Sequence, residues 1–471
     1  MGVGCTGLRI PSWRTTLIFH SRRSALLISL GAITALAAIA CGSDNPPVTI
    51  PTQAPAPTSA PEAAATPIPV TEVPPTAPPA ATAAPVPDAT AAPSLTSPPS
   101  TGDAADQVSL SSENFDGLVE EVGVGTKPAI ALDQDGNPNI AFMFESQDGF
   151  VKASERVDGV WIESLITEGY FYGPLDIDIN PNGAAVVAWH NHQAAQFAPN
   201  LGHVEIAVKT PGGWARRTLQ NQGHDGWDTR LIIDDDGVKH IGAIDPKEFD
   251  GDGVEYYRVE PGGDIIIDQV GSGNLTYKFA VSIAIDSAGI PYLTYYDQDT
   301  NDLILAIRDG SNWILETVDA EGDAGQFAEL VIDGDDRIHI SYVTQIGPDA
   351  ATVKYATRLV SANEWEMRDV DALTQIFYGF EGAREITAID VDSEGNPWIV
   401  YTDESIMKLA VWEGSAWQID SVSIATDRGV AFGQLVTMEL DADDVPHIAT
   451  FEVTDVGPLN GNILYFRGTA R

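Results

Sequence analysis

From about residue 128 onward, the sequence repeats one pattern of apolar and polar positions. A short run in which the two kinds alternate is followed by a tight turn and a second alternating run, as in PAIALDQDGNPNIAFMF from Pro128. Successive side chains of a β-strand point to opposite faces, so the pattern predicts two antiparallel strands joined by a turn. An acidic or amide residue marks each turn, at Asp133, Asn180, Asp234, Asp286, Asp333, Asp392 and Asp441.

The turns have their own chemistry. The marker side chain can accept hydrogen bonds from backbone N–H groups, and the residue three positions later needs a positive φ. Two repeats carry Asp336 and Asp444 at that position, where an aspartate can adopt the left-handed conformation. The other five have glycine there, at Gly136, Gly183, Gly237, Gly289 and Gly395.

Each repeat continues with a third strand, a short turn and a fourth strand. In five repeats the fourth strand begins with tryptophan, as in WILETV, at Trp161, Trp214, Trp313, Trp365 and Trp417. Four antiparallel strands in a repeat of about 50 residues are the signature of a β-propeller blade. The fold class we predict is all-β, a seven-bladed β-propeller with four antiparallel strands per blade.

The last repeat has only three strands and ends in ILYFRG. Its missing fourth strand has a counterpart before the first repeat, FDGLVEEV, in which Gly117 stands at the tryptophan position of a W-x-x-E-x-V pattern. We therefore expect Leu118–Val122 to pair with the strand that contains Tyr465 and to close the ring, which leaves no open end in a circular array.

The repeats resemble the bacterial propellers that are related to sialidases through BNR-type repeats, over about residues 115–471. The resemblance implies the fold. It would also imply glycan hydrolysis if the Asp-box motif S-x-D-x-G-x-T-W and a trio of arginines were present. The equivalent turns IRDGSNW, WEGSAW and ERVDGVW keep the glycine and tryptophan but not the serine–aspartate pattern. No arginine trio can be assigned.

The N-terminus reads as a targeting segment. SRRSALLISLGAITALAAIACGS has a basic flank and an apolar run from Ala25 to Ala40, too short to span a bilayer comfortably. AIAC resembles the lipobox of bacterial lipoproteins, which implies lipidation of Cys41 after removal of residues 1–40. The alternatives are cleavage at the A-x-A site Ala38–Ala40, with release of a secreted protein, and export through the twin-arginine route, which SRRSALL resembles.

A spacer and a strong negative charge complete the organisation. Residues 41–112 are rich in Pro, Ala and Thr and lack aromatic residues, so we expect a disordered spacer ahead of the propeller at 113–471. The net charge is −43, which argues against nucleic acid and against anionic lipid surfaces. We expect an extracytoplasmic monomer that is attached to the cell membrane only by its lipid.

The two faces of the predicted ring differ. The turns between first and second strands and between third and fourth strands define a turn face, and they are short. The loops between second and third strands and the links between blades define a loop face, and they are long and varied. Long loops on a rigid scaffold commonly bind ligands, so we predict that the loop face is the ligand face.

Three groups of residues on the loop face are candidates for binding. Imidazole suits zinc or copper, and oxygen ligands at alternate positions suit calcium, the one cofactor we consider; scattered surface histidines and a solvated acidic loop are the alternatives. Aromatic side chains could stack on sugar rings or could pack between blades. The candidates are the histidines His190, His192, His203 and His224, the acids Asp245, Glu248, Asp250 and Asp252, and the aromatics Tyr172, Trp227, Phe377 and Tyr378.

Three further histidines, His240, His339 and His447, share one repeat position that Tyr292, Trp398 and Asn139 fill elsewhere. A position that accepts all these side chains is expected to serve packing. The functional prediction is a non-catalytic module that binds a protein or glycan at the cell surface. The alternatives are a glycan-acting enzyme, a sialidase-like hydrolase or a lyase, and a purely structural module of the envelope.

Overall fold

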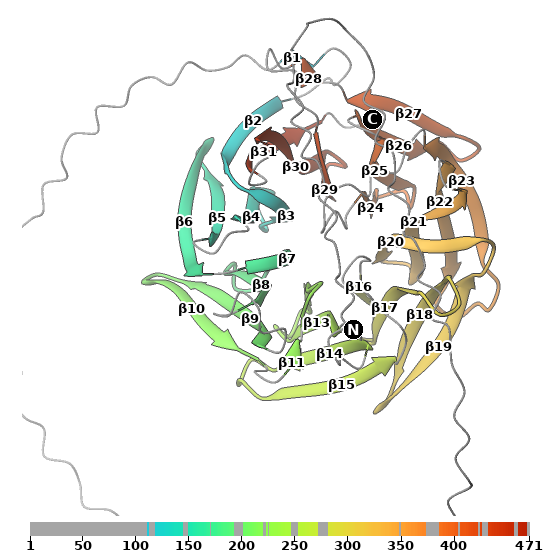
Figure 1. Cartoon of the computed structure of the whole chain (residues 1–471), viewed down its shortest axis with the longest axis horizontal. Helices are drawn as coiled ribbons and strands as arrows, with labels where there is room; N and C mark the ends of the chain where they lie inside the picture. Colours follow the sequence, from blue (N-terminus) through green and yellow to red (C-terminus); the bar gives the residue numbers. More distant parts are fainter. Residues whose placement is uncertain are drawn as a thin grey trace, which may run out of the picture. The chain divides into compact units, whose positions relative to one another are not determined.

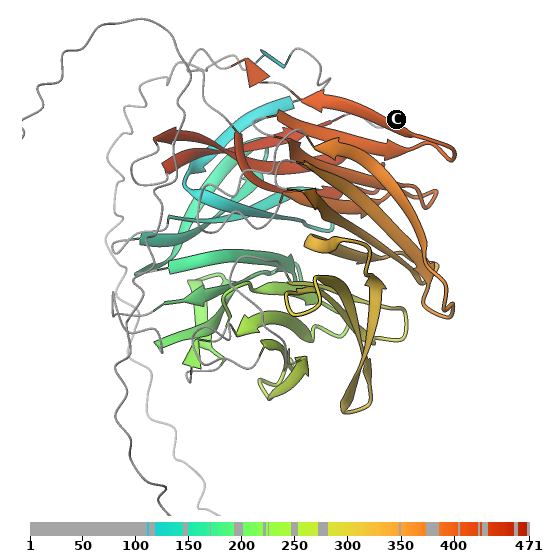
Figure 2. The same ribbon diagram turned by 45° about the vertical axis from the view of Figure 1, so that its right-hand side comes forward.

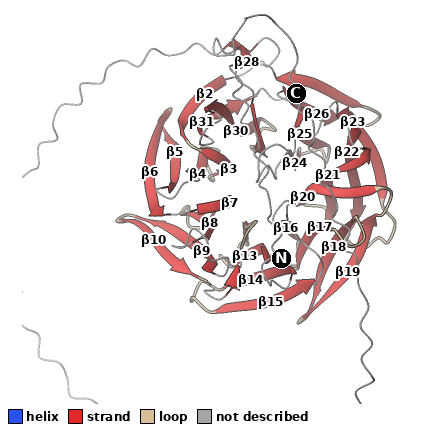
Figure 3. Cartoon of the chain, viewed as in Figure 1, coloured by secondary structure: helices blue, strands red, loops and turns tan. Residues whose placement is uncertain are grey.

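A computed structural model describes the propeller but not every residue of the chain. It covers residues 111–112, 118–144, 149–169, 171–192, 201–219, 223–224, 226–245, 253–271, 281–347, 350–373, 386–403, 406–422, 424–425, 432–455 and 460–468. Cys41, Glu248, Asp250, Asp252, Phe377 and Tyr378 lie outside these residues, as do the side chains of Tyr172 and His224. Strands, turns and bends make up the described part; it contains no helix long and apolar enough to cross a membrane (Figure 3).

Seven four-stranded antiparallel sheets form the blades of a β-propeller, as predicted (Figure 1). Blade 1 contains β3 (Thr126–Leu132), β4 (Pro138–Phe144), β5 (Gly149–Val157) and β6 (Val160–Gly169). Blade 2 contains β7 (Phe171–Ile179), β8 (Ala185–Asn191), β9 (Leu201–Thr210) and β10 (Gly213–Thr218), and β11 (Gly223–His224) pairs with β9. Blade 3 contains β12 (Arg230–Ile233), β13 (Lys239–Asp245), β14 (Gly253–Val259) and β15 (Ile265–Gly271).

The remaining blades repeat this order. Blade 4 contains β16 (Val281–Ile285), β17 (Pro291–Asp297), β18 (Asp302–Asp309) and β19 (Asn312–Asp319). Blade 5 contains β20 (Asp323–Ile332), β21 (Arg337–Gly347), β22 (Ala350–Leu359) and β23 (Glu366–Leu373). Blade 6 contains β24 (Thr387–Val391), β25 (Pro397–Asp403), β26 (Ile406–Trp412) and β27 (Trp417–Val422). Blade 7 contains β29 (Phe432–Leu440), β30 (Pro446–Asp455), β31 (Asn460–Arg467) and β2 (Leu118–Val124).

The predicted ring closure is confirmed. Strand β2 is the outermost strand of blade 7, and Glu120 stands opposite Tyr465 of β31 in the antiparallel register. Figures 1 and 2 show the cyan β2 beside the red strands of the last blade. A second contact adds to the closure, because β1 (Ser111–Ser112) pairs with β28 (Ile424–Ala425), which follows blade 6.

The marker residues organise the turns as the sequence predicted. In the first repeat, Asp133 accepts hydrogen bonds through Oδ1 from the N–H groups of Asp135 (3.0 Å) and Asn137 (2.8 Å). Gly136 has a φ of 75°, and Asp336 and Asp444, which replace glycine, have φ values of 57° and 59°. Both aspartates also bond to the preceding blade; Asp336 accepts from the N–H and the hydroxyl of Ser287 at 2.8 and 2.7 Å.

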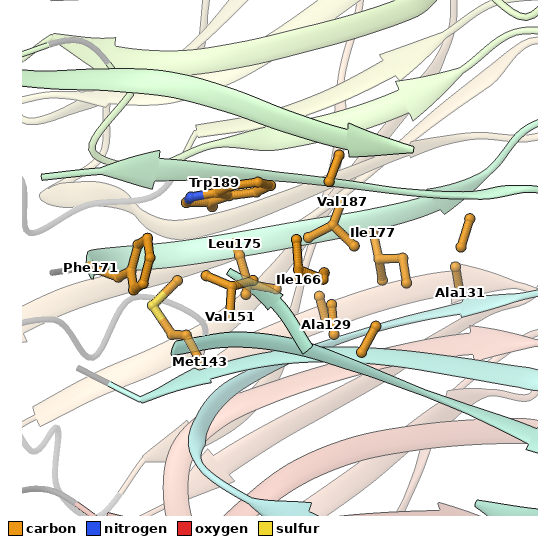
Figure 4. Packing of buried hydrophobic residues seen from close by; sticks show 14 residues of the cluster. Ala129, Ala131, Met143, Val151, Ile166, Phe171, Leu175, Ile177, Val187 and Trp189 are labelled. Carbon is orange, nitrogen blue, oxygen red and sulfur yellow. The ribbon is translucent and has the colours of Figure 1, made fainter. Parts of the chain in front are cut away.

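The core lies between neighbouring blades, in a series of separate apolar clusters. Between blades 1 and 2, Trp189, Leu175 and Phe171 pack on Met143 and Val151, all with at most 1% of their surface exposed (Figure 4). A single blade would leave both faces of its sheet in water, so burial of these apolar side chains requires the ring.

The glutamate of the W-x-x-E pattern connects consecutive blades. Glu316 of blade 4 accepts a hydrogen bond from Trp365 Nε1 (2.7 Å) and forms an ion pair with Arg358 (2.8 Å), both from blade 5. Glu120 makes the same contacts across the closure with Trp161 Nε1 (3.0 Å) and Arg156 (2.9 Å). The glutamate of one outer strand thus holds the tryptophan of the next blade.

Candidate functional site: the polar central cavity

A cavity of about 410 Å³ lies on the axis of the ring, where the innermost strands of the seven blades converge. Each innermost strand follows the link between blades and precedes the marker turn, so it runs from the loop face to the turn face. The polar lining residues stand either two or four positions before a marker. They are Asp176, Asp178, Arg230, Ser282, Glu329, Thr437 and Glu439.

Carboxylates occur in this lining because the inner strands are sheet edges. The N–H groups on their open side need acceptors, and side chains of the preceding blade supply them. Asp178 accepts from Ile233 N–H (2.7 Å), and Glu439 accepts from Leu132 N–H (2.7 Å). Asp390, which stands at the same repeat position in blade 6, accepts from the N–H of the next blade at 2.7 Å.

The end of the cavity nearer the loop face holds a mixed charged cluster. Arg230 forms an ion pair with Glu329 (2.7 Å) and lies 4.0 Å from Asp228, while Glu329 accepts a hydrogen bond from Ser282 Oγ (3.0 Å). The positive charge of Arg230 also acts to lower the pKa of Asp176. The Asp176 carboxylate accepts a hydrogen bond from the N–H of Leu231 at 2.8 Å. Four blades, 2 to 5, therefore contribute a guanidinium, carboxylates and a hydroxyl to one region.

Backbone strain is found at the same end. Lys127 of blade 1 and Phe327 of blade 5 stand six positions before their markers, with φ values of 52° and 55°. Bulky side chains seldom adopt this conformation, and such strain is concentrated at functional sites. The hydroxyl of Thr387 bonds to the carbonyl oxygen of Phe327 at 2.8 Å and so fixes the distorted segment.

The cavity raises the pKa values of its acids. Burial raises the pKa of Asp178 and of Glu329 to about 7, although Arg230 acts against the shift at Glu329. Burial also raises the pKa of Asp176 and of Asp390 to about 6. For Glu439 burial raises the pKa well above its ordinary value, and the charges of Asp178 and Asp390 add to the shift. Asp176, Asp178, Glu329 and Asp390 can therefore gain or lose protons near neutral pH.

Of the predicted metal ligands, the structure places two histidines together. His190 is fully buried, and its ring lies 5.7 Å from that of His192. His203 instead contacts Glu205, with its Nε2 atom 3.2 Å from Glu205 Oε1. Asp245 is buried at the end of β13. In the part of the chain that the structure describes, no three His, Cys, Asp or Glu side chains come together as a metal site. Other proposed ligands lie outside that part, so the zinc or copper and calcium sites remain predictions.

The aromatic candidate Trp227 is 5% exposed and stacks on His190, with ring centroids 5.2 Å apart. The packing interpretation of the repeated histidines is confirmed. His240, His339 and His447 are buried, and each bonds through Nε2 to the marker aspartate of its own repeat at 3.1–3.2 Å.

Sequence reasoning missed the residues of the cavity, although a signal was present. Inner strands that are otherwise apolar carry charged residues at fixed distances from the marker, as in DIDIN, TRLII, AELVI, AIDV and TMEL. The repeat register alone places these charges on the axis. Several long loops of the predicted ligand face, such as 246–252 and 374–385, lie outside the described residues.

Comparisons with known proteins find solved structures of low sequence identity. An ulvan lyase from a new family of polysaccharide lyases, solved bound to -[GlcA(1-4)Rha3S]-, is 11% identical, with a TM-score of 0.51 over 76% of this chain and 96% of that chain. A second polysaccharide lyase is 8% identical, with a TM-score of 0.45 over 73% of this chain and 90% of that chain. The Aleuria aurantia lectin, as a variant in complex with Fucalpha1-6GlcNAc, is 14% identical, with a TM-score of 0.42 over 64% of this chain and 98% of that chain.

No family model and no curated protein matches the sequence. At these levels of identity, the likeness to solved structures concerns the propeller fold and assigns no activity to this chain.

Proposed function

We propose that this chain is a propeller that binds a glycan at the loop-face end of its central cavity, without turning it over. The observation that carries the proposal is the convergence of Arg230, Asp176, Glu329 and Ser282 in a cavity of about 410 Å³ beside strained backbone. Guanidinium donors and carboxylate acceptors together suit sugar hydroxyls, which both donate and accept hydrogen bonds. Glycans are also the ligands of the lyase and the lectin whose folds this chain shares.

The experiment is a glycan array probed with the purified protein and with two arginine variants. Arg230→Gln removes the central guanidinium, and we expect at least tenfold weaker binding of any glycan that the parent retains. The matched control is Arg217→Ala on β10, an exposed position on an outer strand. Equal binding by the parent and Arg230→Gln, at equal melting temperature, would contradict the central site.

A glycan-acting enzyme is the second candidate, and one observation favours it. Glu329 and Asp178 have pKa values of about 7, as general acids and bases at neutral pH require. Release of reducing ends or unsaturated sugars from polysaccharides, abolished by Asp178→Asn without loss of binding, would establish catalysis in place of simple binding. Binding with no product after prolonged incubation would support the non-catalytic module.

We also propose that Cys41 carries a lipid and holds the propeller outside the cytoplasmic membrane on its Pro/Ala/Thr-rich spacer. The AIAC sequence at the end of the apolar segment supports this. Mass spectrometry of the mature N-terminus tests it: a diacylated Cys41 as first residue is expected, and an unmodified cysteine would indicate a secreted protein.

A further inference from the structure

A buried relay of three side chains recurs at three blade junctions. Between blades 3 and 4, Asp234 Oδ2 lies 3.2 Å from His240 Nε2, and His240 Nδ1 lies 2.6 Å from the hydroxyl of Tyr256. The same arrangement occurs between blades 5 and 6, with Asp333, His339 and Tyr355, and between blades 7 and 1, with Asp441, His447 and Tyr465. Its recurrence indicates a structural role.

At the junction of blades 3 and 4, a groove on the turn face lies above this relay. Its volume is about 340 Å³, and two arginines line it together with the Gly289–Pro291 turn. Arg258 stands opposite His240 in the register, and Arg308 lies over the Tyr256 ring at 5.0 Å. Ion pairs of 2.7 Å, to Glu260 and Asp268 respectively, hold both guanidinium groups in place.

The other two relays provide an internal comparison. At the junction of blades 7 and 1, Arg467 stands opposite His447. Arg156 occupies the position of Arg308, because it stands opposite Trp161 on the neighbouring strand as Arg308 stands opposite Trp313. At the junction of blades 5 and 6, the corresponding residues are Thr357 and Trp412. Since the relay of Tyr355 and His339 forms without the arginine pair, the pair is not needed to build it.

The charges around the groove define the ligand. Arg258 and Arg308 are accompanied by the carboxylates of Asp234, Glu260, Asp268 and Asp309, and burial lowers the pKa of His240, which keeps it neutral. The excess of acids disfavours an anion. Ordered pairs of N–H donors and carboxylate acceptors instead match hydroxyl groups, and Ile290 and Pro291 offer an apolar surface for the C–H face of a ring.

We propose that junctions 3/4 and 7/1 are equivalent binding sites for a neutral pyranose with adjacent hydroxyl groups. Each of them combines an arginine opposite the relay histidine with a second arginine from the next blade. The junction 5/6 lacks this site. These sites are on the turn face, so they are separate from the central cavity and do not depend on its function.

Titration calorimetry of the full chain with neutral methyl hexopyranosides (gluco, galacto and manno forms) tests the proposal, and methyl glucuronide serves as the anionic comparison. For a sugar that binds, we expect each of Arg258→Thr and Arg467→Thr, which copy the natural residue of junction 5/6, to remove one site. The double variant should bind that sugar at least tenfold more weakly at the junctions. Thr357→Ala at junction 5/6 is the matched control and should leave binding unchanged.

Several outcomes would overturn the junction sites: no neutral sugar in the panel binds, methyl glucuronide binds more tightly, or the double variant binds with the affinity and stoichiometry of the parent. Arg230→Gln separates this proposal from the central one. If Arg230→Gln abolishes sugar binding and the double variant retains it, the central cavity alone is supported. The reverse result would support the junctions alone.

Discussion

Protonation of the central carboxyls should make this protein more stable as the pH falls from 8 to 5. Burial raises the pKa values of Asp178 and Glu329 to about 7 and those of Asp176 and Asp390 to about 6. A carboxyl with a raised pKa in the folded state binds its proton more tightly there than in the unfolded chain. Its stabilising effect is therefore complete below pH 4 and is lost as the pH rises through the folded-state value.

The magnitude follows from the shifts. One pKa unit corresponds to about 1.4 kcal/mol, and the pKa values of the four groups lie about two to three units above their ordinary values. These side chains keep part of their surface open to the cavity, so water there weakens the effect. With about one unit realised per group, the four carboxyls change the free energy of unfolding by about 5 kcal/mol between pH 5 and pH 8.

Chemical denaturation at pH 5, 6, 7 and 8 measures this change. Glu439→Gln should reduce the slope, because it removes one charge from the cluster while its amide oxygen can still accept from Leu132 N–H. We expect this variant to be about 1–3 kcal/mol more stable than the parent at pH 8. Glu394→Gln, in an exposed turn, is the control. Stability that rises steadily from pH 5 to pH 8 in the parent would refute the reasoning.

Three further predictions concern the ring itself. Gly461→Ala should destabilise the protein by about 2–4 kcal/mol in urea unfolding, because the added Cβ would lie 2.2 Å from the backbone oxygen of Glu452. The control Gly262→Ala should be neutral, because its Cβ would meet nothing within 4 Å. Glu316→Ala should cost about 2–3 kcal/mol by the same measurement, because Arg358 is 3% exposed and loses its carboxylate partner, although it keeps its backbone carbonyl acceptors. Glu413→Ala, in an exposed turn, should have no such cost. Deletion of residues 113–123 removes most of β2 and should leave an aggregating product without a cooperative melting transition; a deletion product that melts like the parent would contradict closure by β2.

The repeat determines how much could be predicted from the sequence. The alternating runs, the marker turns and the incomplete last repeat were enough for the blade number and for the pairing of Leu118–Val122 with the strand that contains Tyr465, because each depends on local chemistry or on a missing strand. The role of Glu316 could not be read from its pattern, since its partners Trp365 and Arg358 belong to the next blade. The cavity acids had a visible signal, but their meaning arises only when seven inner strands meet on one axis.

The two ends of the cavity differ in a way that restricts any ligand. Toward the loop face, Arg230 is balanced by Glu329 and Asp228, so donors and acceptors are both present. Toward the turn face, Asp178, Asp390 and Glu439 repel one another, as the further rise in the pKa of Glu439 shows. A carboxylate or sulfate that entered from the loop face would be repelled by the increasing negative charge along the axis. A neutral sugar would not be repelled. We therefore expect the proposed central site to bind neutral glycans in preference to acidic ones. A preference for acidic over neutral glycans on the array would show that the loop-face guanidinium outweighs the acids beyond it.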